Sequence, residues 1–401
     1  MNRFPAYRVY LIWSAVTAFA FSTFATLSSV YRVQIAGLDP LELILIGTVL
    51  ELTVFLFELP TGIVADSYSR RLSVIIGMVL IGVGFLLEGA VPVFGSMLLA
   101  QIIWGLGATF ESGAVDAWIS DEIGEARANQ AFLRSSQVAQ LSSFLGIGLS
   151  VLLGSVYLGL PMMVGGGIFL LLAVLLIVIM PENGFERSPE ASRNPFKSMR
   201  ETLGAGLELT KRKPVLLTIF LITAILGASS ETFDRLSEAH FIRDIGLPEQ
   251  LSPALLFGLI QLAVGLLSIL ATEIVKRRVD TGAHLAVARV LLGINITLSI
   301  CVVLFGVLGN FYLALAVYMS AVLMRKLNAP LYKAWLNQNL ETKTRATVFS
   351  MNGQMDALGQ ISGGPLLGLV AKTAGMPIAF VIAGLILLPA SYLYTRSLDK
   401  K

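Results

Sequence analysis

Long apolar runs, interrupted by short polar breaks, occupy most of the chain. Each run reaches the ~20 residues that a helix needs to cross the hydrocarbon core of a membrane. Reading the runs between charges, glycines and prolines predicts twelve spans. They lie at residues 9–33, 41–65, 72–91, 94–119, 130–156, 160–180, 214–241, 252–275, 284–306, 310–336, 346–371 and 376–395. The pattern therefore predicts an all-α polytopic membrane protein.

One polar segment is longer than all the other breaks. Residues 181–213 are basic and rich in Pro, Ser and Asn, which is typical of a hydrated loop. We expect an N-terminal bundle of six helices over residues 1–180, a cytoplasmic linker over 181–213 and a C-terminal bundle of six helices over 214–401.

The composition narrows the class of protein. Hydrophobic residues make up 55% of the chain and charged residues 14%, against about 25% charged residues in a soluble domain, which excludes a soluble fold. One cysteine and two histidines cannot build a thiolate cluster or a multi-histidine site, so we expect no metal and no cofactor. The bases lie in short loops rather than on one face, which does not favour a nucleic-acid partner.

Lys and Arg are distributed unevenly between alternate loops. With the N-terminus inside, the loops on the cytoplasmic side carry about twenty bases and the loops on the other side about three. Because cytoplasmic loops are enriched in Lys and Arg, we expect both termini in the cytoplasm.

The two halves share a weak internal repeat at an offset of about 217 residues. In this register Ala117-Trp118 matches Ala334-Trp335, and Gly146 matches Gly363. Two parallel repeats of six spans would place a solute site near the membrane midplane, between the halves.

A charged motif follows the second span and reads Gly62-Ile-Val-Ala-Asp66-Ser-Tyr-Ser-Arg70-Arg71. It resembles the cytoplasmic loop motif of the major facilitator superfamily, Gly-x-x-x-Asp-(Arg/Lys)-x-Gly-(Arg/Lys)-(Arg/Lys), with serines in place of one base and one glycine. The resemblance implies a secondary transporter of two six-helix bundles, in which spans one, four, seven and ten line a central cavity and give alternating access to it.

The same resemblance implies roles for the motif. Gly62 would permit close helix approach, and Asp66 would face the N-terminal end of span eleven, where the helix dipole favours its charge. Arg70 would pair with Asp121 at the end of span four. Together with Arg71, this cluster would act as a conformational latch that holds the halves in the outward-open state.

Ionisable side chains inside the spans are the remaining candidates, because each costs about 2.5–3.5 kcal/mol at the membrane centre and so marks a cavity or a partner. Proton-coupling candidates are the carboxylates Glu111, Glu51, Glu231 and Asp356, with Glu111 favoured because it lies deep on span four. Substrate-cavity candidates are Asp116, Asp234, Arg235, Arg325, Lys326 and Tyr332.

Two further charges have simpler expectations. Arg235 is expected to pair with Glu231 or Glu238 on the same helix face. Glu88, near the end of span three, is expected to be hydrated.

Within the superfamily the chain is similar to bacterial drug and small-molecule exporters, through Glu58-Leu-Pro-Thr-Gly62, Glu111-Ser-Gly113-Ala-Val-Asp116-Ala-Trp118 and Glu231-Thr-Phe-Asp-Arg235. This resemblance implies multidrug efflux: proton-coupled export of lipophilic or cationic compounds across the bacterial inner membrane, by antiport. The aromatic side chains Phe19, Phe21, Phe24, Trp104, Phe110 and Phe233 would supply apolar walls for such compounds. Protons, a small-molecule substrate and the lipid bilayer are the expected partners, and a monomer is expected.

Two alternatives stay open. A proton-coupled carrier of an organic anion is one, since Arg325-Lys326 would attract carboxylate or phosphate. A membrane receptor of carrier ancestry that does not transport is the other. An enzyme is not expected, because the sequence offers no ATP-binding loop and no recognisable nucleophile, metal or cofactor site.

Overall fold

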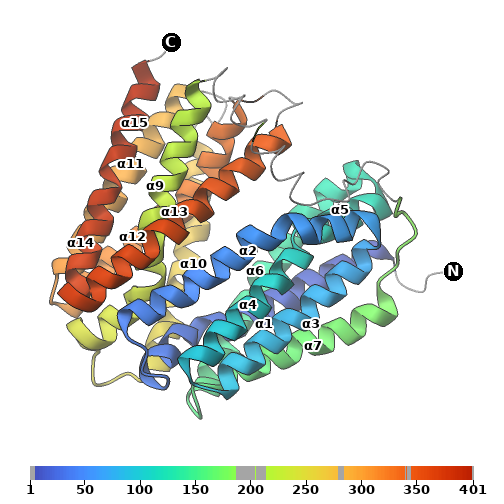
Figure 1. Ribbon diagram of the computed structural model, residues 1–401, viewed down its shortest axis with the longest axis horizontal. Helices are drawn as coiled ribbons and strands as arrows, with labels where there is room; N and C mark the ends of the chain where they lie inside the picture. The colour runs from blue at the N-terminus through green and yellow to red at the C-terminus, as the bar shows by residue number, and fades with distance from the viewer. Residues whose placement is uncertain are drawn as a thin grey trace. The chain divides into compact units, whose positions relative to one another are not determined.

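The computed structural model describes residues 5–186, 204, 214–278, 284–338, 340 and 345–399 (Figure 1). Its helices are α1 (Ala6–Gln34), α2 (Pro40–Ser67), α3 (Arg70–Ala90), α4 (Phe94–Glu111), α5 (Ala114–Ile123), α6 (Glu125–Gly154), α7 (Leu160–Ile179), α9 (Pro214–His240), the π-helical turn η1 (Phe241–Ile245), α10 (Pro253–Arg278), α11 (His284–Val307), α12 (Phe311–Gln338), α13 (Arg345–Ala374), α14 (Met376–Ile386) and α15 (Leu388–Asp399). From residue 187 onward, residue 204 excepted, the predicted linker 181–213 lies outside the described residues.

Ten helical segments of the described chain are long and apolar enough to cross a membrane, by length and composition. Among these, α4 with α5, α9 with η1 and α14 with α15 each form one segment. Helices α12 and α13 have 28 and 30 residues but carry charges such as Arg325, Lys326 and Asp356 within their length. With these two helices the structure has the twelve spans that the sequence predicts, and the all-α fold is confirmed.

Helix starts follow from local hydrogen bonds. At the start of α2, the Glu42 backbone N–H donates to the Asp39 carboxylate over 3.0 Å, and the Asp39 N–H donates to the Glu42 carboxylate over 2.9 Å, a reciprocal capping box. At the start of α3, the Ser69 hydroxyl accepts a hydrogen bond from the Leu72 N–H over 2.9 Å.

The chain divides into two compact units by its contacts. The first unit contains residues 1–37, 49–199 and 252–259, and the second contains residues 38–48, 200–251 and 260–401. Two helices therefore belong partly to each unit, because α2 divides after Thr48 and α10 divides after Leu259. The predicted division of the chain at the linker stays a prediction.

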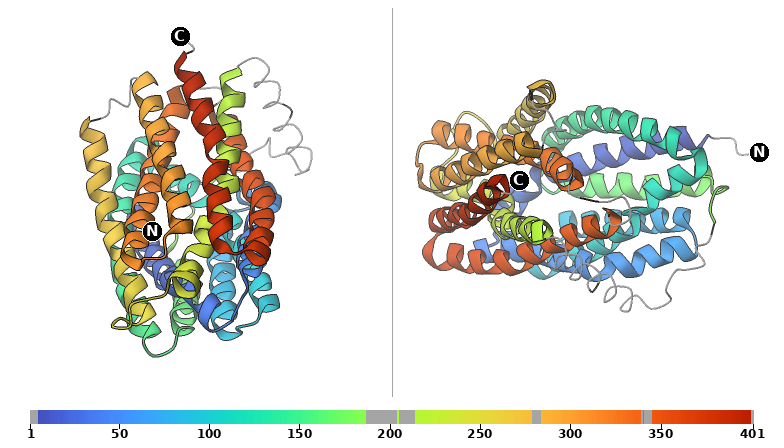
Figure 2. Two further views of the ribbon diagram at one scale, coloured as in Figure 1. Left: turned by 90° about the vertical axis from the view of Figure 1, so that its left-hand side faces the viewer. Right: turned by 90° about the horizontal axis from the view of Figure 1, so that it is seen from above.

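In the first unit, α1 packs along α6 and α7, and α3 packs along α4 and α7. The core contains Phe24 and Phe85, whose rings stack with centroids 3.6 Å apart, and Trp104 meets the Phe85 ring edge-on at 5.2 Å. In the second unit, α9 packs along α13, and α11 packs against α12 and α14 (Figure 2). Its core includes Trp335 and Tyr394, with ring centroids 5.6 Å apart.

The predicted repeat has a counterpart in the packing of the two units. Gly146 of α6 lies against the Phe19 carbonyl of α1, so that a Cβ atom there would clash. Gly363, its partner in the repeat register, lies in the same way on Ala228 of α9. Small residues let helix backbones approach closely, and in each unit the matched glycine serves this close approach.

The prediction that Glu88 is hydrated is wrong. Glu88 is 1% exposed, and its carboxylate accepts hydrogen bonds from Arg32 Nε over 2.8 Å and from Gln101 Nε2 over 2.7 Å. Arg32 is 3% exposed and Gln101 is fully buried, so the three polar groups form one buried cluster between α1, α3 and α4. A buried charge needs such partners, which is why Glu88 can lie inside the bundle.

Candidate functional site

The fourth span is broken between α4 and α5. Helix α4 ends at Glu111 and α5 begins at Ala114, with Gly113 between them at φ +72°, a conformation that favours glycine. Broken helices are tolerated at membrane depth where the irregular backbone is buried in protein or lines a cavity. Here the break leaves the Glu111 side chain at a helix end rather than on a continuous helix.

A cavity of about 450 Å³ lies in the first unit beside this break. Four aromatic rings line it, from Trp13 and Phe21 of α1, Trp104 of α4 and Phe169 of α7. Of the described residues that line the cavity, only Glu111 has an acidic or basic side chain. An aromatic wall with one carboxylate suits a compound that is apolar and cationic.

One hydrogen-bond donor in this cavity is unused. The indole Nε1 of Trp13 is buried and has no hydrogen-bond partner among the described residues. The neighbouring hydroxyls donate to the backbone instead: Ser14 to the Ser135 carbonyl over 3.2 Å, and Thr17 to the Trp13 carbonyl over 2.7 Å. Since buried donors are normally satisfied, Trp13 is the group that a bound compound would meet.

Asp116, a predicted cavity residue, lies beyond the break in the first turn of α5. The Tyr10 hydroxyl donates to its carboxylate over 3.5 Å, and the Tyr10 ring stacks on Trp13 at 5.7 Å. Asp116 therefore adjoins the cavity through Tyr10 and Trp13, but it does not line it.

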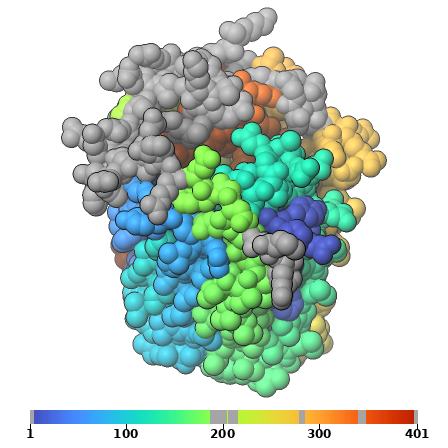
Figure 3. Space-filling model, turned by 90° about the vertical axis from the view of Figure 1, so that its right-hand side faces the viewer, coloured from blue at the N-terminus to red at the C-terminus, as the bar shows by residue number. Residues whose placement is uncertain are grey.

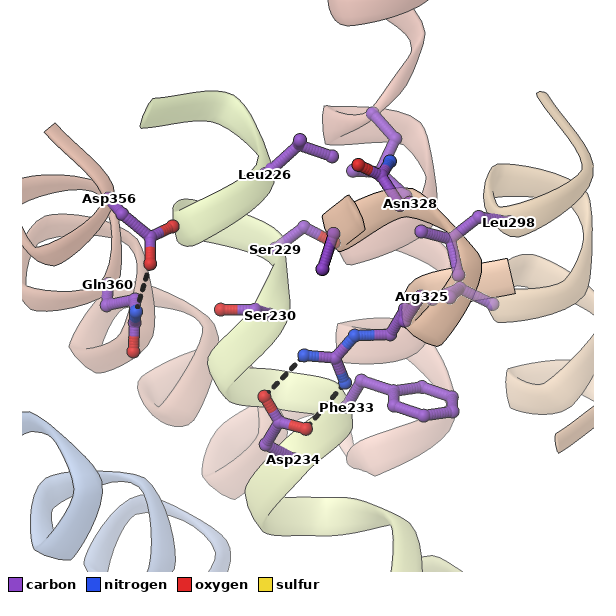
Figure 4. Close-up of a pocket in the computed structure, with 13 residues that line it drawn as sticks. Leu226, Ser229, Ser230, Phe233, Asp234, Leu298, Arg325, Asn328, Asp356 and Gln360 are labelled. Atoms are coloured by element: carbon purple, nitrogen blue, oxygen red, sulfur yellow. Dashed lines mark hydrogen bonds and ion pairs between the residues drawn. The ribbon is translucent and has the colours of Figure 1, made fainter. Parts of the chain in front are cut away.

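The second unit contains a smaller cavity of about 230 Å³, with an ion pair in its wall (Figure 4). Arg325 of α12 donates two parallel hydrogen bonds to Asp234 of α9, over 2.5 and 2.6 Å. The guanidinium lies 5.3 Å from the centre of the Phe233 ring, a cation–π contact. Asp356 of α13 also lines this cavity and accepts a hydrogen bond from Gln360 over 3.0 Å.

Glu231 lies outside this cavity and is only 1% exposed. Its carboxylate pairs with Arg235 Nε at 3.3 Å, which confirms the pairing of Arg235 with an acid on its own helix. A Cβ atom on Gly47 of α2 would clash with both side chains, so glycine leaves the room that this pair occupies. The arrangement makes Glu231 a structural partner of Arg235.

Three other predicted residues are not brought to the cavities. Tyr332 is buried in the core of the second unit, where its hydroxyl donates to the Ile219 carbonyl over 2.8 Å. Lys326 is exposed, and Glu51 is half-buried on α2. None of the three lines either cavity. The spacing of these residues in the sequence indicates which face of a helix they share, but it does not indicate which helix packs against that face.

The charged motif after α2 forms part of the expected cluster. Arg70 pairs with Asp121 of α5, as predicted, and lies 3.7 Å from Asp66. Arg71 donates to the Ile177 carbonyl at the end of α7. Within the first unit, a Cβ atom on Gly62 would meet no described atom within 4 Å, so Gly62 does not serve a close approach there. The expected position of Asp66 at span eleven stays a prediction.

The segment that follows α7 contributes partners that are not among the predicted residues. Glu182 accepts hydrogen bonds from the Ser69 hydroxyl over 2.7 Å and from the Arg71 N–H over 2.9 Å, which completes the cap of α3. The Trp118 indole donates to the Pro181 carbonyl over 2.6 Å. Figure 3 shows residues 181–186, in light green, between the start of α3 and α5. In the sequence, the signal that could have identified Glu182 is a carboxylate directly after the proline that follows a span.

Several polar cavity residues also lie outside the predictions. Ser230 precedes Asp234 by four residues, Asn328 follows Arg325 by three, and Gln360 follows Asp356 by four. Residues at these spacings share a helix face. Polar residues one turn from a charged candidate were therefore the signal that could have identified them.

Among the described residues, no group of three or more His, Cys, Asp or Glu side chains could hold a metal ion. At the turn before α2, Asp39 pairs with Lys372 of α13 at 2.7 Å. Burial raises the pKa of Asp39, but hydrogen bonds from the Lys372 ammonium and the Glu42 backbone outweigh this and hold that pKa below its ordinary value.

Comparison with known proteins identifies the family. The model of the Major Facilitator Superfamily matches residues 10–324. The chain belongs to this superfamily. It is 24% identical, over 392 residues, to the uncharacterized MFS-type transporter YxaM of Bacillus subtilis (strain 168). The alignment covers 96% of this chain and 94% of that protein. It is therefore a multi-pass membrane protein and a transporter that acts on a small-molecule substrate.

Solved structures of transporters have the same fold. The nucleoside transporter NupG is similar with a TM-score of 0.79 at 11% identity, covering 99% of this chain and all of the other. A POT family transporter in complex with 5-aminolevulinic acid gives a TM-score of 0.70 at 15% identity, covering 98% and 96%. The human organic anion transporter MFSD10 gives 0.62 at 17% identity, covering 97% and 99%. At these identities the likeness concerns the fold alone.

Proposed function

We propose that this transporter exports small amphipathic cations in exchange for protons. The observation that carries the proposal is the cavity of the first unit, which is lined by the rings of Trp13, Phe21, Trp104 and Phe169 and by a single ionisable group, Glu111. Cations are attracted to aromatic faces, most strongly where water is excluded. The carboxylate supplies the complementary charge.

The ion pair of the second cavity also supports a cationic substrate. Arg325 is held by Asp234 through two hydrogen bonds, so its charge is already matched and two of its five N–H donors are engaged. A substrate anion would have to compete with Asp234 for the charge of Arg325. The charged groups of the two cavities thus favour a cationic substrate.

Antiport follows if a proton and the cation compete for one carboxylate. Glu111 would release the substrate when it takes a proton on one side of the membrane, and would bind the next substrate when the proton leaves on the other. Two six-helix bundles, residues 1–180 and 214–401, would move about this group as a monomer. The bases of the loops favour an orientation with both termini in the cytoplasm, and we place the protein in the bacterial inner membrane.

A carrier of small organic anions is the second candidate. It is supported by Arg325, which lines the cavity of the second unit and could bind a carboxylate if Asp234 released it. In that case Arg325→Gln should abolish transport, whereas export of a cation should survive this change.

The test is transport in proteoliposomes under an imposed pH gradient, with a lipophilic quaternary cation and a monocarboxylate as probes. Glu111→Gln resembles the protonated carboxyl group. It should lower pH-driven cation transport at least about tenfold, equivalent to about 1.4 kcal/mol, while exchange at equal pH persists. Glu273→Gln, which changes an exposed carboxylate on α10, is the matched control.

Two outcomes would contradict the proposal. Full uphill transport by Glu111→Gln would pass the coupling role to Glu51, Glu231 or Asp356. Transport of the monocarboxylate alone would favour the second candidate.

A further inference from the structure

A buried histidine ends the seventh span. His240, the last residue of α9, is 2% exposed. Its Nδ1 lies 2.7 Å from the carboxylate of Asp244, and its Nε2 lies 3.1 Å from the carbonyl oxygen of Phe305 on α11. The rings of Phe305 and Phe380 flank the imidazole, with centroids 5.0 and 5.1 Å away. Both polar partners of the ring are therefore oxygen atoms, in apolar surroundings.

These two contacts determine how many protons His240 and Asp244 hold between them. A carbonyl oxygen only accepts hydrogen bonds, so Nε2 must carry a hydrogen. A carboxylate also accepts, so a further proton must lie between Nδ1 and Asp244. Since an imidazole is a stronger base than a carboxylate, the proton belongs on the ring. The geometry is that of an imidazolium paired with a carboxylate.

Loss of this proton cannot leave both contacts intact. If Nδ1 lost its hydrogen, its lone pair would face the Asp244 carboxylate at 2.7 Å. If Nε2 lost it instead, its lone pair would face the Phe305 carbonyl at 3.1 Å. Each arrangement sets two acceptors against each other, so one of the contacts must break.

Among the described residues of the helices beside His240, we find no other ionisable side chain in a position to bind this proton in its place. Helix α14 contains none. On α11 the nearest is Cys301, one turn before Phe305, while Arg289 lies roughly 24 Å from Phe305 along the helix. Tyr318 of α12 meets the Phe305 ring at 5.7 Å.

The neighbours of His240 on its own span are directed elsewhere. Arg243 donates to the Leu38 carbonyl over 2.8 Å. Glu238, two residues before His240, lies on another helix face. Next to Leu38, Asp39 is paired with Lys372.

Access to the proton runs through Asp244. Its side chain is 33% exposed, whereas that of His240 is 2% exposed. Asp244 lies in η1, which is closed by a hydrogen bond of 3.0 Å from the Gly246 N–H to the Phe241 carbonyl. π-helical turns are rare, and they frequently lie at functional sites.

We infer that His240 and Asp244 form a proton-binding site separate from both cavities, and that its occupancy sets whether the end of α9 stays joined to α11. The site adjoins α2 as well, because Arg243 holds the Leu38 carbonyl just before that helix. Helix α2 belongs to the second unit up to Thr48 and then continues into the first. A proton on His240 thus stabilises the segment just before α2, at Leu38 of the second unit. The inference is independent of the role of Glu111.

The protonation of the ring can be observed directly. The chain has two histidines, so His284→Gln leaves His240 as the only one. Nitrogen NMR of this variant, with labelled histidine, should show both ring nitrogens protonated in the folded protein. An unprotonated Nδ1 in the folded variant would overturn the inference.

Asp244→Asn in the same background is the matched variant. The asparagine amide can donate to Nδ1 while Nε2 still donates to Phe305, so every contact is kept without the extra proton. Only one ring nitrogen should then be protonated at the same pH. An equal protonation state in both variants would contradict the inference. If Asp244→Asn does not fold, the NMR result for His284→Gln decides alone.

The junction of α9 with α11 gives a second readout. Hydrogen-exchange protection of residues 240–246, corrected for the intrinsic effect of pH, should fall in the natural chain as rising pH removes the proton from the His240 ring. It should stay constant in Asp244→Asn. Protection that does not depend on pH in the natural chain would rule out control of this junction by the proton. Transport by Glu111→Gln is a separate measurement, so failure of either proposal can be told from failure of the other.

Discussion

The first unit contains a buried polar cluster of Arg32, Glu88 and Gln101. The contribution of this cluster to the stability of the fold can be measured. Glu88→Gln removes the charge that matches Arg32 and leaves a buried guanidinium uncompensated. Breaking one side of a buried ion pair costs about 3–5 kcal/mol, so the variant should unfold at a clearly lower temperature than the natural chain in detergent.

The matched control for this change is Glu273→Gln. Glu273 and Arg277 also form an ion pair, but their side chains are 48% and 75% exposed. Water already solvates both groups, so the unfolding temperature should hardly change. Equal effects of Glu88→Gln and Glu273→Gln would show that burial of Arg32 and Glu88 does not determine their contribution.

At the residue scale, the sequence identifies which charges need partners but not which partners they find. The pairs of Arg70 with Asp121 and of Arg235 with Glu231 were predictable, one from a resemblance and one from helix spacing. The partner of Glu88 was not, because Arg32 lies on another helix, far away in the sequence. Contacts between helices depend on their packing, which the pattern of a single span does not contain.

At the element scale, the break between α4 and α5 can be tested through Gly113. Its φ of +72° is unfavourable for a residue with a side chain, so Gly113→Ala should cost roughly 1–2 kcal/mol or force the break to change shape. Either result alters the position of Glu111, and we expect slower cation transport with normal membrane insertion. Initial transport rates in proteoliposomes measure this.

Gly167→Ala provides the comparison. Gly167 lies within α7, and a Cβ atom there would meet no described atom within 4 Å. Alanine in this helix should be neutral for transport, since it adds no strain and no contact. If Gly113→Ala transported as fast as Gly167→Ala, the shape of the break would not matter for function.

The spans were predictable to within a few residues, because apolar runs of about 20 residues have few other uses. The irregular points inside them were not. Nothing in the apolar run separates Ser112-Gly113 from other glycine-containing stretches that stay helical, such as Gly146-Ile-Gly148 of α6. Whether a glycine breaks a helix depends on what packs against it, and this is why the cavity beside Glu111 could not be drawn from the sequence.

At the scale of the whole molecule, the pH dependence of stability should separate from that of transport. The pKa of Asp39 is lowered by its partners, so its stabilising effect is present above its ordinary pKa and is lost as the pH falls through the lowered value. Asp39→Asn keeps a capping residue at the start of α2 but loses the charge that faces Lys372.

The difference in unfolding temperature between Asp39→Asn and the natural chain should therefore be constant from about pH 5 to about pH 8, and should shrink below about pH 4. Transport near neutral pH should keep its pH profile in this variant. A change of that profile would mean that Asp39 takes part in proton coupling.

The last prediction concerns the cluster around Arg70, for which the superfamily resemblance suggests a latch between the halves. Arg70 has two acidic neighbours: Asp121, which it contacts closely, and Asp66, at 3.7 Å with a side chain that is 53% exposed. Asp66→Asn leaves the pair with Asp121 intact and removes an exposed charge, so the free energy of unfolding should change by less than about 1 kcal/mol. Transport should nevertheless fall, because the state that the latch stabilises would be less populated. Asp121→Asn removes the main partner of Arg70 and should lower both stability and transport. Thermal unfolding and proteoliposome transport of the two variants, at equal membrane insertion, distinguish a latch from a structural ion pair. Natural transport rates in Asp66→Asn would exclude the latch and leave Arg70 as a residue that only holds α5 and residues 181–186 in place.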